Sequence, residues 1–242
     1  MNFLIIGGTG VMGTSAIKAI REHFDKNSVI IANWFGKETD EFQIEGADHT
    51  IFGDINNPSC RNEIKSFNNA KFDYMFYATA LGDVGIPIKD ATQEQIDRSN
   101  KLSFDPILQL ENELDIGTIV AYSTFYTIRH QLSTYGAMGH SKENIEKWTV
   151  AEDGSSNHAC IRAGLFESAS SRGIKLLLRK TSKNIDNLKD PLLRSYFENT
   201  PSSIGIKKFE EGIFTEEKEK YGDCRTNKED LFKAHLDLFK SD

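Results

Sequence analysis

Tyr135, Met138 and Lys142 are the residues whose types and spacing most directly suggest chemistry in this sequence. Met138 lies four residues before Lys142, and Tyr135 lies seven residues before it. Because an α-helix has about 3.6 residues per turn, both spacings return to the same helix face. We therefore expect a phenol, a thioether and an ammonium group to face one cleft.

The distance between the phenol and the ammonium group bears on the reaction. In a ketone reduction, the carbon that receives hydride carries the oxygen that receives the proton. In the conjugate reduction of an enoyl thioester, hydride goes to the β-carbon and charge develops on a carbonyl oxygen two carbons further on. A phenol that stabilises this charge must stand where the charge develops, and Tyr135 lies about one turn beyond position 138. Alternatively, Tyr135 is a loop aromatic residue and the protein lacks a proton donor.

The pattern of apolar runs predicts the elements that position these side chains. Short apolar runs alternate with segments of helical periodicity, which is typical of a parallel sheet with helices on both faces. We expect an α/β protein, one Rossmann-type, doubly wound domain over residues 1–242. The predicted strands span 2–6, 29–32, 49–52, 74–78, 118–122 and 159–162. The predicted helices span 11–23, 92–114, 135–150 and 227–239, and Pro106 should kink or divide the second of them.

Residues 165–220 are polar and charged and follow the last predicted strand. We expect helices and loops that form a substrate lid over the cleft rather than a second core, because lids are drawn from weakly packed segments. The alternative is a solvated surface segment.

A glycine-rich turn joins the first predicted strand to the first predicted helix. Its glycines at 7, 10 and 13 permit a tight turn, close approach of a pyrophosphate and close packing of the helix. The backbone N–H groups at the start of the helix then face the phosphates. The predicted dinucleotide contacts in this turn are Gly7, Thr9, Gly10, Val11, Met12 and Gly13.

The segment after the second predicted strand bears on the choice of dinucleotide. An NAD site usually has an Asp or Glu here for the ribose hydroxyls, and the stretch Ala32–Lys37 has neither. Asn33, beside Trp34, would hydrogen-bond a ribose or phosphate oxygen, and Lys37 would pair with a 2′-phosphate. We therefore expect NADPH as the cofactor, with NADH as the alternative.

Two further strand ends complete the predicted cofactor site. Asp54 and Ile55 follow the third strand, where Asp54 would accept a hydrogen bond from the adenine amino group. Small residues follow the fourth strand and would let the backbone pass close to the ribose and nicotinamide; they are Ala78, Thr79 and Ala80. Asn100, on the next helix, either holds a water molecule or is a plain helix-surface residue.

Composition excludes several classes of function. The 242 residues are 38% hydrophobic and 27% charged, which is typical of a globular protein rather than a disordered one. A net charge of −7 argues against nucleic acid as a main partner. We find no secretory signal, and no stretch approaches the ~20 apolar residues of a membrane span, so we expect a cytoplasmic protein. The three cysteines lack CxxC spacing and no ligand cluster predicts a metal site.

These features together resemble a known superfamily. The glycine-rich turn, the Asp-Ile pair and the strand alternation resemble the short-chain dehydrogenases/reductases. Within that superfamily, Tyr135-x-x-Met138-x-x-x-Lys142 resembles the divergent enoyl-acyl-carrier-protein reductases, whose signature is Tyr-x-x-Met-x-x-x-Lys. The segment 163–174, an Ala-Gly leading through Ser168 to Gly-Ile, resembles that branch's segment after strand six.

The resemblance implies a function and a set of roles. It implies NAD(P)H-dependent reduction of an enoyl thioester carried by an acyl carrier protein or coenzyme A, in fatty acid biosynthesis or a specialised pathway. Tyr135 would stabilise the enolate and Lys142 would bind the nicotinamide ribose. Met138 would line the cofactor or acyl pocket, with Phe125 or Tyr126 beside the substrate. The implied cofactor contacts after strand six are Ala163, Gly164 and Ser168.

The sequence also departs from the enoyl reductase pattern. Its glycine turn resembles that of extended or atypical members, and residues 176–242 lack the usual Val-Asp-Gly-Gly ending that supports subunit contacts. We still expect a homo-oligomer, on the analogy of the superfamily alone. Two alternatives are a ketone or sugar reductase, with Ser123 or Thr124 in its serine position, and a dinucleotide-sensing regulator without catalysis.

Overall fold

The computed structural model describes residues 1–37, 42–151, 154–222 and 226–240. Within these residues, six parallel strands form one sheet in the order β3-β2-β1-β4-β5-β6. The strand order reverses between β1 and β4, which is the doubly wound Rossmann topology. The predicted fold class is therefore confirmed. The strands are β1 (Asn2–Ile6), β2 (Val29–Trp34), β3 (His49–Phe52), β4 (Lys71–Tyr77), β5 (Asp115–Thr124) and β6 (Asn157–Ala163).

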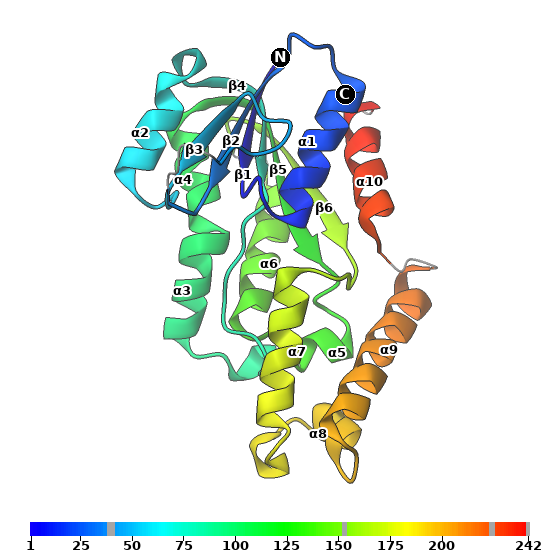
Figure 1. Cartoon of the computed structure of the whole chain (residues 1–242). Helices are drawn as coiled ribbons and strands as arrows, with labels where there is room; N and C mark the ends of the chain where they lie inside the picture. Colours follow the sequence, from blue (N-terminus) through cyan, green and yellow to red (C-terminus); the bar gives the residue numbers. More distant parts are fainter. Residues whose placement is uncertain (38–41, 152–153, 223–225, 241–242) are drawn as a thin grey trace.

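Helices cover both faces of the sheet (Figure 1). One face packs against α1 (Val11–His23) and α10 (Lys228–Lys240). The opposite layer contains α2 (Pro58–Ser66), α3 (Gln93–Ser103), α4 (Asp105–Glu113) and α6 (Gly136–Thr149). The short helix α5 (Arg129–Leu132) precedes α6, and three 3₁₀ turns lie at Asn68–Ala70, Ile88–Asp90 and Ile185–Asn187.

The alternation of side chains along β1 shows why the sheet needs both layers. Phe3 and Ile5 enter the cluster under α1 and α10, whereas Leu4 and Ile6 enter the cluster under α2, α4 and α6. All four side chains are at most 1% exposed. A strand that is apolar at consecutive positions is buried on both faces, as expected of a parallel sheet.

Local signals set the helix boundaries. The Thr92 side chain caps α3 in a capping box with Gln95, and Asn57 caps α2, which has Pro58 in its first turn. The long predicted helix divides at Phe104, so that Pro106 lies in the first turn of α4, where a missing N–H costs nothing. The predicted break is confirmed, whereas α2 is a helix that the sequence pattern did not predict.

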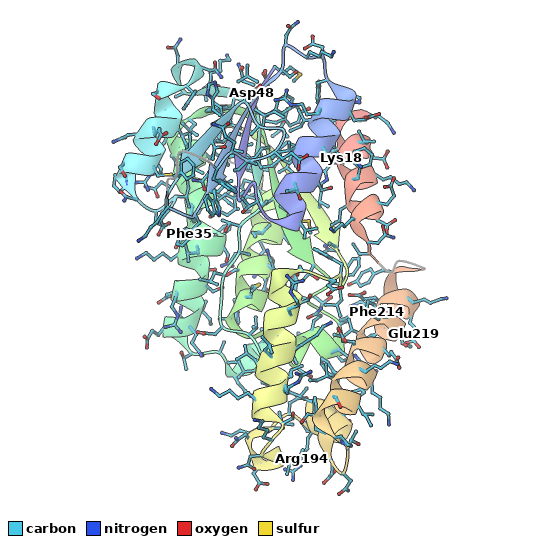
Figure 2. The ribbon with its side chains drawn as sticks, in the orientation of Figure 1. Lys18, Phe35, Asp48, Arg194, Phe214 and Glu219 are labelled. Carbon is cyan, nitrogen blue, oxygen red and sulfur yellow. The ribbon has the colours of Figure 1, made fainter. Side chains whose placement is uncertain are left out.

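Three further helices form a lobe beyond the carboxyl ends of the strands (Figure 1). They are α7 (Ala169–Thr181), α8 (Pro191–Phe197) and α9 (Ser202–Tyr221). Arg194 lies at the tip of this lobe, remote from Phe35 and Asp48 in the sheet layer (Figure 2).

The lobe has an apolar core of its own, so the prediction of helices and loops without a second core is wrong. Its cluster comprises Ile128, Leu178, Leu188, Leu193, Phe197, Ile206, Phe209 and Ile213. In α9 the buried Ile206, Phe209 and Ile213 recur at spacings of three and four, so they form one helix face. Lys and Glu residues on the outer faces give the segment its polar composition, so the composition alone does not reveal the apolar face.

A hydrogen-bonded cluster joins α9 to α5. Glu216 Oε2 lies 2.5 Å from His130 Nδ1, and Glu216 Oε1 accepts from the Arg129 amide at 2.8 Å. His130 Nε2 lies 2.8 Å from the Tyr196 hydroxyl on α8. Burial alone would raise the pKa of Glu216, but the bonds from the His130 side chain and the two backbone amides outweigh it and lower the pKa to about 2.

Two findings concern predicted absences. No described helix is both long and apolar enough to cross a membrane. Cys60 and Cys160 are free thiols, and Cys224 lies outside the described residues.

Candidate active site

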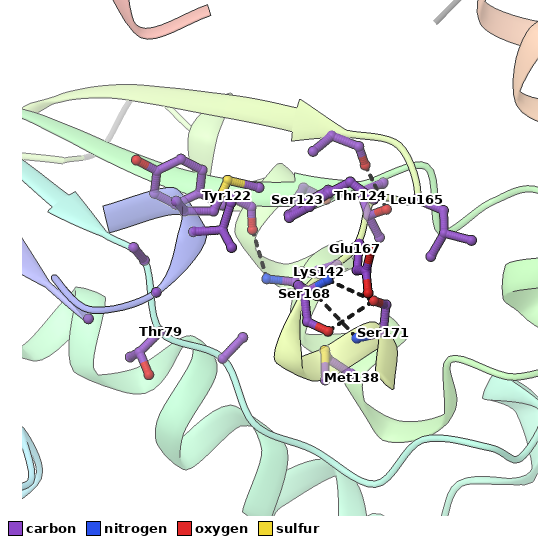
Figure 3. Close-up of a pocket in the computed structure, with 18 of the residues that line it drawn as sticks. Thr79, Tyr122, Ser123, Thr124, Met138, Lys142, Leu165, Glu167, Ser168 and Ser171 are labelled. Carbon is purple, nitrogen blue, oxygen red and sulfur yellow. Dashed lines mark hydrogen bonds between the residues drawn. The ribbon is translucent and has the colours of Figure 1, made fainter. Parts of the chain in front are cut away.

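A cavity of about 600 Å³ lies at the carboxyl ends of the strands, where their order reverses. Ligands of open α/β sheets bind in this crevice. The strand ends β1, β4, β5 and β6 contribute walls, and α6 and the start of α7 close the other side (Figure 3). Predicted site residues that line it are Gly7, Thr9, Gly10, Val11, Met12, Trp34, Ala78, Thr79, Ala80, Tyr135, Met138, Lys142, Ala163, Gly164 and Ser168.

The glycine-rich turn forms an open cradle at one end of the cavity. Gly7 has a φ of +85°, which favours glycine, and a Cβ on Gly13 would lie 2.4 Å from the Gly7 carbonyl oxygen. A Cβ on Gly10 would meet only one atom, at 3.5 Å, so space is left beside the turn. The first turn of α1 has no acidic residue and no side-chain cap. Its free N–H groups and the helix dipole fit a pyrophosphate.

Residues 135–142 bring the three chemical groups to the cavity. Gly136 begins α6 with a φ of +48°, and a Cβ there would lie 2.3 Å from the Asp83 carbonyl oxygen. Tyr135 directly precedes this helix, and Met138 and Lys142 lie within it on the same face. All three line the one cavity, as their spacing predicts.

The protonation states of the phenol and the ammonium group suit proton donation at neutral pH. Burial raises the pKa of Tyr135 to about 12, so its hydroxyl stays protonated. Burial lowers the pKa of Lys142 to about 8, although Cys160 and Glu146 oppose this. Lys142 Nζ donates to the Tyr122 carbonyl at 2.8 Å (Figure 3). An ammonium group has three N–H donors, and within the described chain only this one bond is formed, which leaves donors for a ligand.

Helix α10 hydrogen-bonds Tyr122 of β5, the residue whose carbonyl accepts from Lys142. His235 Nδ1 lies 2.6 Å from the Leu231 carbonyl and must donate to it, so Nε2 accepts from the Tyr122 hydroxyl at 2.7 Å. Burial lowers the pKa of His235 to about 4, so the ring is neutral at pH 7. The neutral ring ties α10 to the same residue whose carbonyl binds Lys142.

Both hydroxyls in the predicted serine position line the cavity. Ser123 Oγ donates to Glu146 Oε1 at 2.6 Å, and Thr124 Oγ1 donates to the Ala163 carbonyl at 2.8 Å. Each hydroxyl therefore has its proton committed to a protein acceptor in this structure.

The loop between β6 and α7 rests on a buried carboxyl group. Glu217 is 0% exposed; its Oε1 accepts from the Leu165 amide at 2.9 Å, and its Oε2 has no hydrogen-bond partner among the described residues. Burial raises the pKa of Glu217 to about 7, against the effect of the Leu165 bond. A Cβ on Gly164 would lie 2.7 Å from Oε2, so a larger residue there would have to displace the Glu217 carboxyl group.

Ser168 lines the cavity at the start of α7, but its hydroxyl has a local partner. Ser168 Oγ accepts from the Ser171 amide at 3.1 Å, and Ser171 Oγ accepts from the Ser168 amide at 2.8 Å. This reciprocal capping box fixes the first turn of α7 (Figure 3).

Several predicted cofactor residues do not line the cavity. Asn33 is 3% exposed and donates to the Ile51 and Gly53 carbonyls, so it joins β2 to the end of β3. Asp54 Oδ1 accepts from the Asn56 amide in a local turn, and Ile55 belongs to the core. The remaining ones are Lys37, which is exposed, and Gly13, which packs beneath the turn.

The two candidate substrate aromatics also lie outside the cavity lining. Phe125 stacks on Tyr221 of α9 with ring centroids 4.0 Å apart, and Tyr126 follows it at the end of β5. Asn100 accepts from Ser141 at 2.8 Å and thereby joins α3 to α6, so packing is its role in this structure.

Other residues of the lining were missed from the sequence. Phe35 is 66% exposed beside Trp34, Arg172 lies in the first turns of α7, and Lys228 begins α10. Gln131 also lines the cavity, and its spacing of four from Tyr135 was the signal that would have found it. No cluster of metal-ligating side chains occurs in the part of the chain that the structure describes.

Comparisons with known proteins support the fold. No protein-family model matches the sequence, and no curated protein matches it. A short-chain dehydrogenase family protein from Francisella tularensis superposes with a TM-score of 0.63 at 19% identity, over 98% of this chain and 89% of that one. A short-chain dehydrogenase/reductase from Saccharomyces cerevisiae gives 0.58 at 15% identity, over 82% and 83%.

A third similar structure was determined with a nicotinamide dinucleotide. The 3-ketoacyl-(acyl-carrier-protein) reductase from Brucella melitensis, complexed with NADH, gives a TM-score of 0.50 at 13% identity, over 61% of this chain and 66% of that one. At such identities these likenesses show a shared fold.

Proposed function

We propose that this protein is an NAD(P)H-dependent reductase of the short-chain dehydrogenase/reductase type that reduces the carbon–carbon double bond of an enoyl thioester. The observation that carries the proposal is that Tyr135, Met138 and Lys142 line one cavity with the glycine-rich turn. The fold shared with dehydrogenases and reductases supports it.

The residues of the chain have distinct roles in this reaction. A reduced nicotinamide dinucleotide, bound at the glycine-rich turn, supplies the hydride that the β-carbon of the substrate accepts. Tyr135, protonated at neutral pH, donates a hydrogen bond to the thioester carbonyl oxygen, where negative charge develops. Lys142 uses its remaining N–H donors on the nicotinamide ribose, and its positive charge favours the same charge development. A proton from solvent then adds to the α-carbon, which completes the reduction.

The cofactor choice and the lid are part of the same proposal. Among the residues that the structure describes, neither an acidic side chain nor Lys37 lines the cavity beside Trp34 and Phe35. We propose NADPH as the cofactor, with NADH also accepted. We propose that α7–α9 act as the substrate lid, because Leu165, Phe166 and Ile174 extend the cavity wall into that lobe.

Turnover of thioesters tests this function. Crotonyl-CoA should oxidise NADPH, followed by absorbance, and Tyr135→Phe should lower kcat by about 10²-fold or more while the NADPH dissociation constant stays unchanged. Tyr221→Phe is a matched control, because it removes a hydroxyl that lies outside the cavity lining and whose hydrogen-bond partner among the described residues is Thr127. Equal rates for Tyr135→Phe and wild type would refute the assigned role of the phenol.

A ketone reductase is the second candidate, because Ser123 and Thr124 line the same cavity as Tyr135 and Lys142. An assay with acetoacetyl-CoA beside crotonyl-CoA distinguishes ketone reduction from enoyl reduction. Turnover of acetoacetyl-CoA without turnover of crotonyl-CoA favours ketone reduction, with Ser123 released from Glu146 to bind the carbonyl oxygen. Dinucleotide binding without turnover of either favours a non-catalytic regulator.

A further inference from the structure

Gln131 presents its side-chain amide to the large cavity. The residue as a whole is 3% exposed, its amide makes no side-chain hydrogen bond among the described residues, and the amide is not one of the fully enclosed polar groups that lack a partner, so it is open to the cavity. A side-chain amide placed in this way offers two N–H donors and an oxygen acceptor to a ligand.

The position of Gln131 relative to Tyr135 is fixed by the backbone. The Gln131 carbonyl accepts from the Tyr135 amide at 2.8 Å, one helical turn later. Residues four apart in such a turn lie on the same side, and both side chains line the cavity. The amide therefore lies next to the place where a substrate meets the Tyr135 phenol.

An apolar recess opens beside Gln131. It holds about 20 Å³, and its apolar lining comes from Ile174 and Leu178 of α7 together with Ile206, Phe209 and Ile213 of α9. Thr134, Ser171, Lys175 and Glu210 also border it. Gln131, Leu165 and Ile174 line both the recess and the large cavity, so the two spaces adjoin. A volume of this size is that of one or two water molecules, and its apolar walls suit a methyl or ethyl group.

We infer that Gln131 and this recess form the subsite for a short acyl chain, with the Gln131 amide bonded to the substrate carbonyl group and the alkyl end in the recess. The inference rests on the proposed function and names its substrate class, which is acyl thioesters of about four carbons. A longer chain does not fit the recess unless α7 and α9 separate.

Chain-length preference and ligand binding test the subsite together. The probes are N-acetylcysteamine thioesters of crotonate and of 2-decenoate. Wild type should favour the crotonyl over the decenoyl thioester by about tenfold or more in kcat/KM. Gln131→Leu keeps the side-chain size and removes the hydrogen bond, so crotonyl kcat/KM should fall about five- to tenfold. Ile174→Ala enlarges the recess and should reduce the preference for the shorter chain.

Two readouts separate this inference from the reductase proposal. NADPH affinity of both variants should match wild type, and thermal unfolding of Gln131→Leu should also match it, which excludes misfolding. Ile174→Ala removes apolar contacts with the lobe core, so it should unfold at a lower temperature in a transition that stays cooperative. Saturation-transfer NMR on the NADP⁺-bound protein measures thioester binding without turnover. Binding of the crotonyl thioester that Gln131→Leu weakens, with no turnover by wild type, would uphold the subsite and refute the reductase.

Three outcomes overturn the subsite itself. They are equal binding and kcat/KM for Gln131→Leu and wild type, a wild-type preference for the decenoyl thioester, and absence of binding of either thioester.

Discussion

The buried carboxyl group of Glu217 predicts an unusual dependence of stability on pH. Its pKa rises from 4.5 to about 7 on folding because the side chain is removed from water. Between those values the folded protein holds a proton that the unfolded chain has lost, so the free energy of unfolding falls as pH rises. At about 1.4 kcal/mol for each tenfold change in proton binding, this amounts to about 3 kcal/mol between pH 4 and pH 8.

Glu217→Gln should remove this loss, since an amide carries no charge at any pH and its oxygen still accepts from the Leu165 amide. Urea unfolding of both proteins, from pH 4 to pH 8, gives the test. The difference in unfolding free energy should shift by about 3 kcal/mol in favour of the variant as pH rises. The new amide N–H groups of Glu217→Gln can lower stability by an amount that does not depend on pH. Such a constant cost does not affect the change with pH of the difference in unfolding free energy between variant and wild type.

The preceding residue is the matched control with the opposite sign. The pKa of Glu216 is lowered to about 2, so its contribution to stability is present above pH 4.5 and lost as pH falls towards 2. Glu216→Gln should therefore show a constant loss of stability between pH 5 and pH 8. Parallel curves for Glu217→Gln and wild type over that range would show that Glu217 is ionised in the folded protein and would refute the reasoning.

Two further predictions concern the cofactor end of the site. Gly13→Ala places a Cβ 2.4 Å from the Gly7 oxygen, so it should destabilise the protein by about 1–3 kcal/mol and weaken NADPH binding. Thermal melting and NADPH titration measure the two effects. Gly173→Ala is the control, because its Cβ meets nothing within 4 Å, and it should change neither stability nor binding. Because burial lowers the pKa of Lys142 to about 8, kcat/KM should fall as pH rises through about 8, and Lys142→Arg, which stays charged, should lose that fall. If kcat/KM of Lys142→Arg also falls as pH rises through about 8, the group that titrates is not Lys142.

The sequence pattern predicted those parts of the molecule that local physics controls. Strand β3 has the predicted bounds, and the helix break beside Pro106 follows from one missing N–H. The cavity residues 135, 138 and 142 were found because helical spacing alone sets their common face. These predictions needed no knowledge of which segments meet in space.

The remaining features depend on contacts between distant segments. Asn33 was expected to bind the cofactor, but it bonds backbone carbonyls around β3, and no local signal reveals those partners. The lobe core was missed because it joins α7, α8 and α9 with Ile128, and each helix alone has a polar composition. Glu217 bonds Leu165, which lies 52 residues earlier in the sequence, a pairing that only the folded chain creates.

The packing of α10 on α1 has a consequence for how the chain folds during synthesis. Phe239 of α10 contacts Phe3, Phe24 and Tyr74, which belong to the first half of the chain. Until α10 leaves the ribosome, this aromatic surface has no cover, and such exposed apolar surface makes nascent chains prone to aggregate. The native cover of this aromatic surface is therefore the last helix of the described chain to be synthesised.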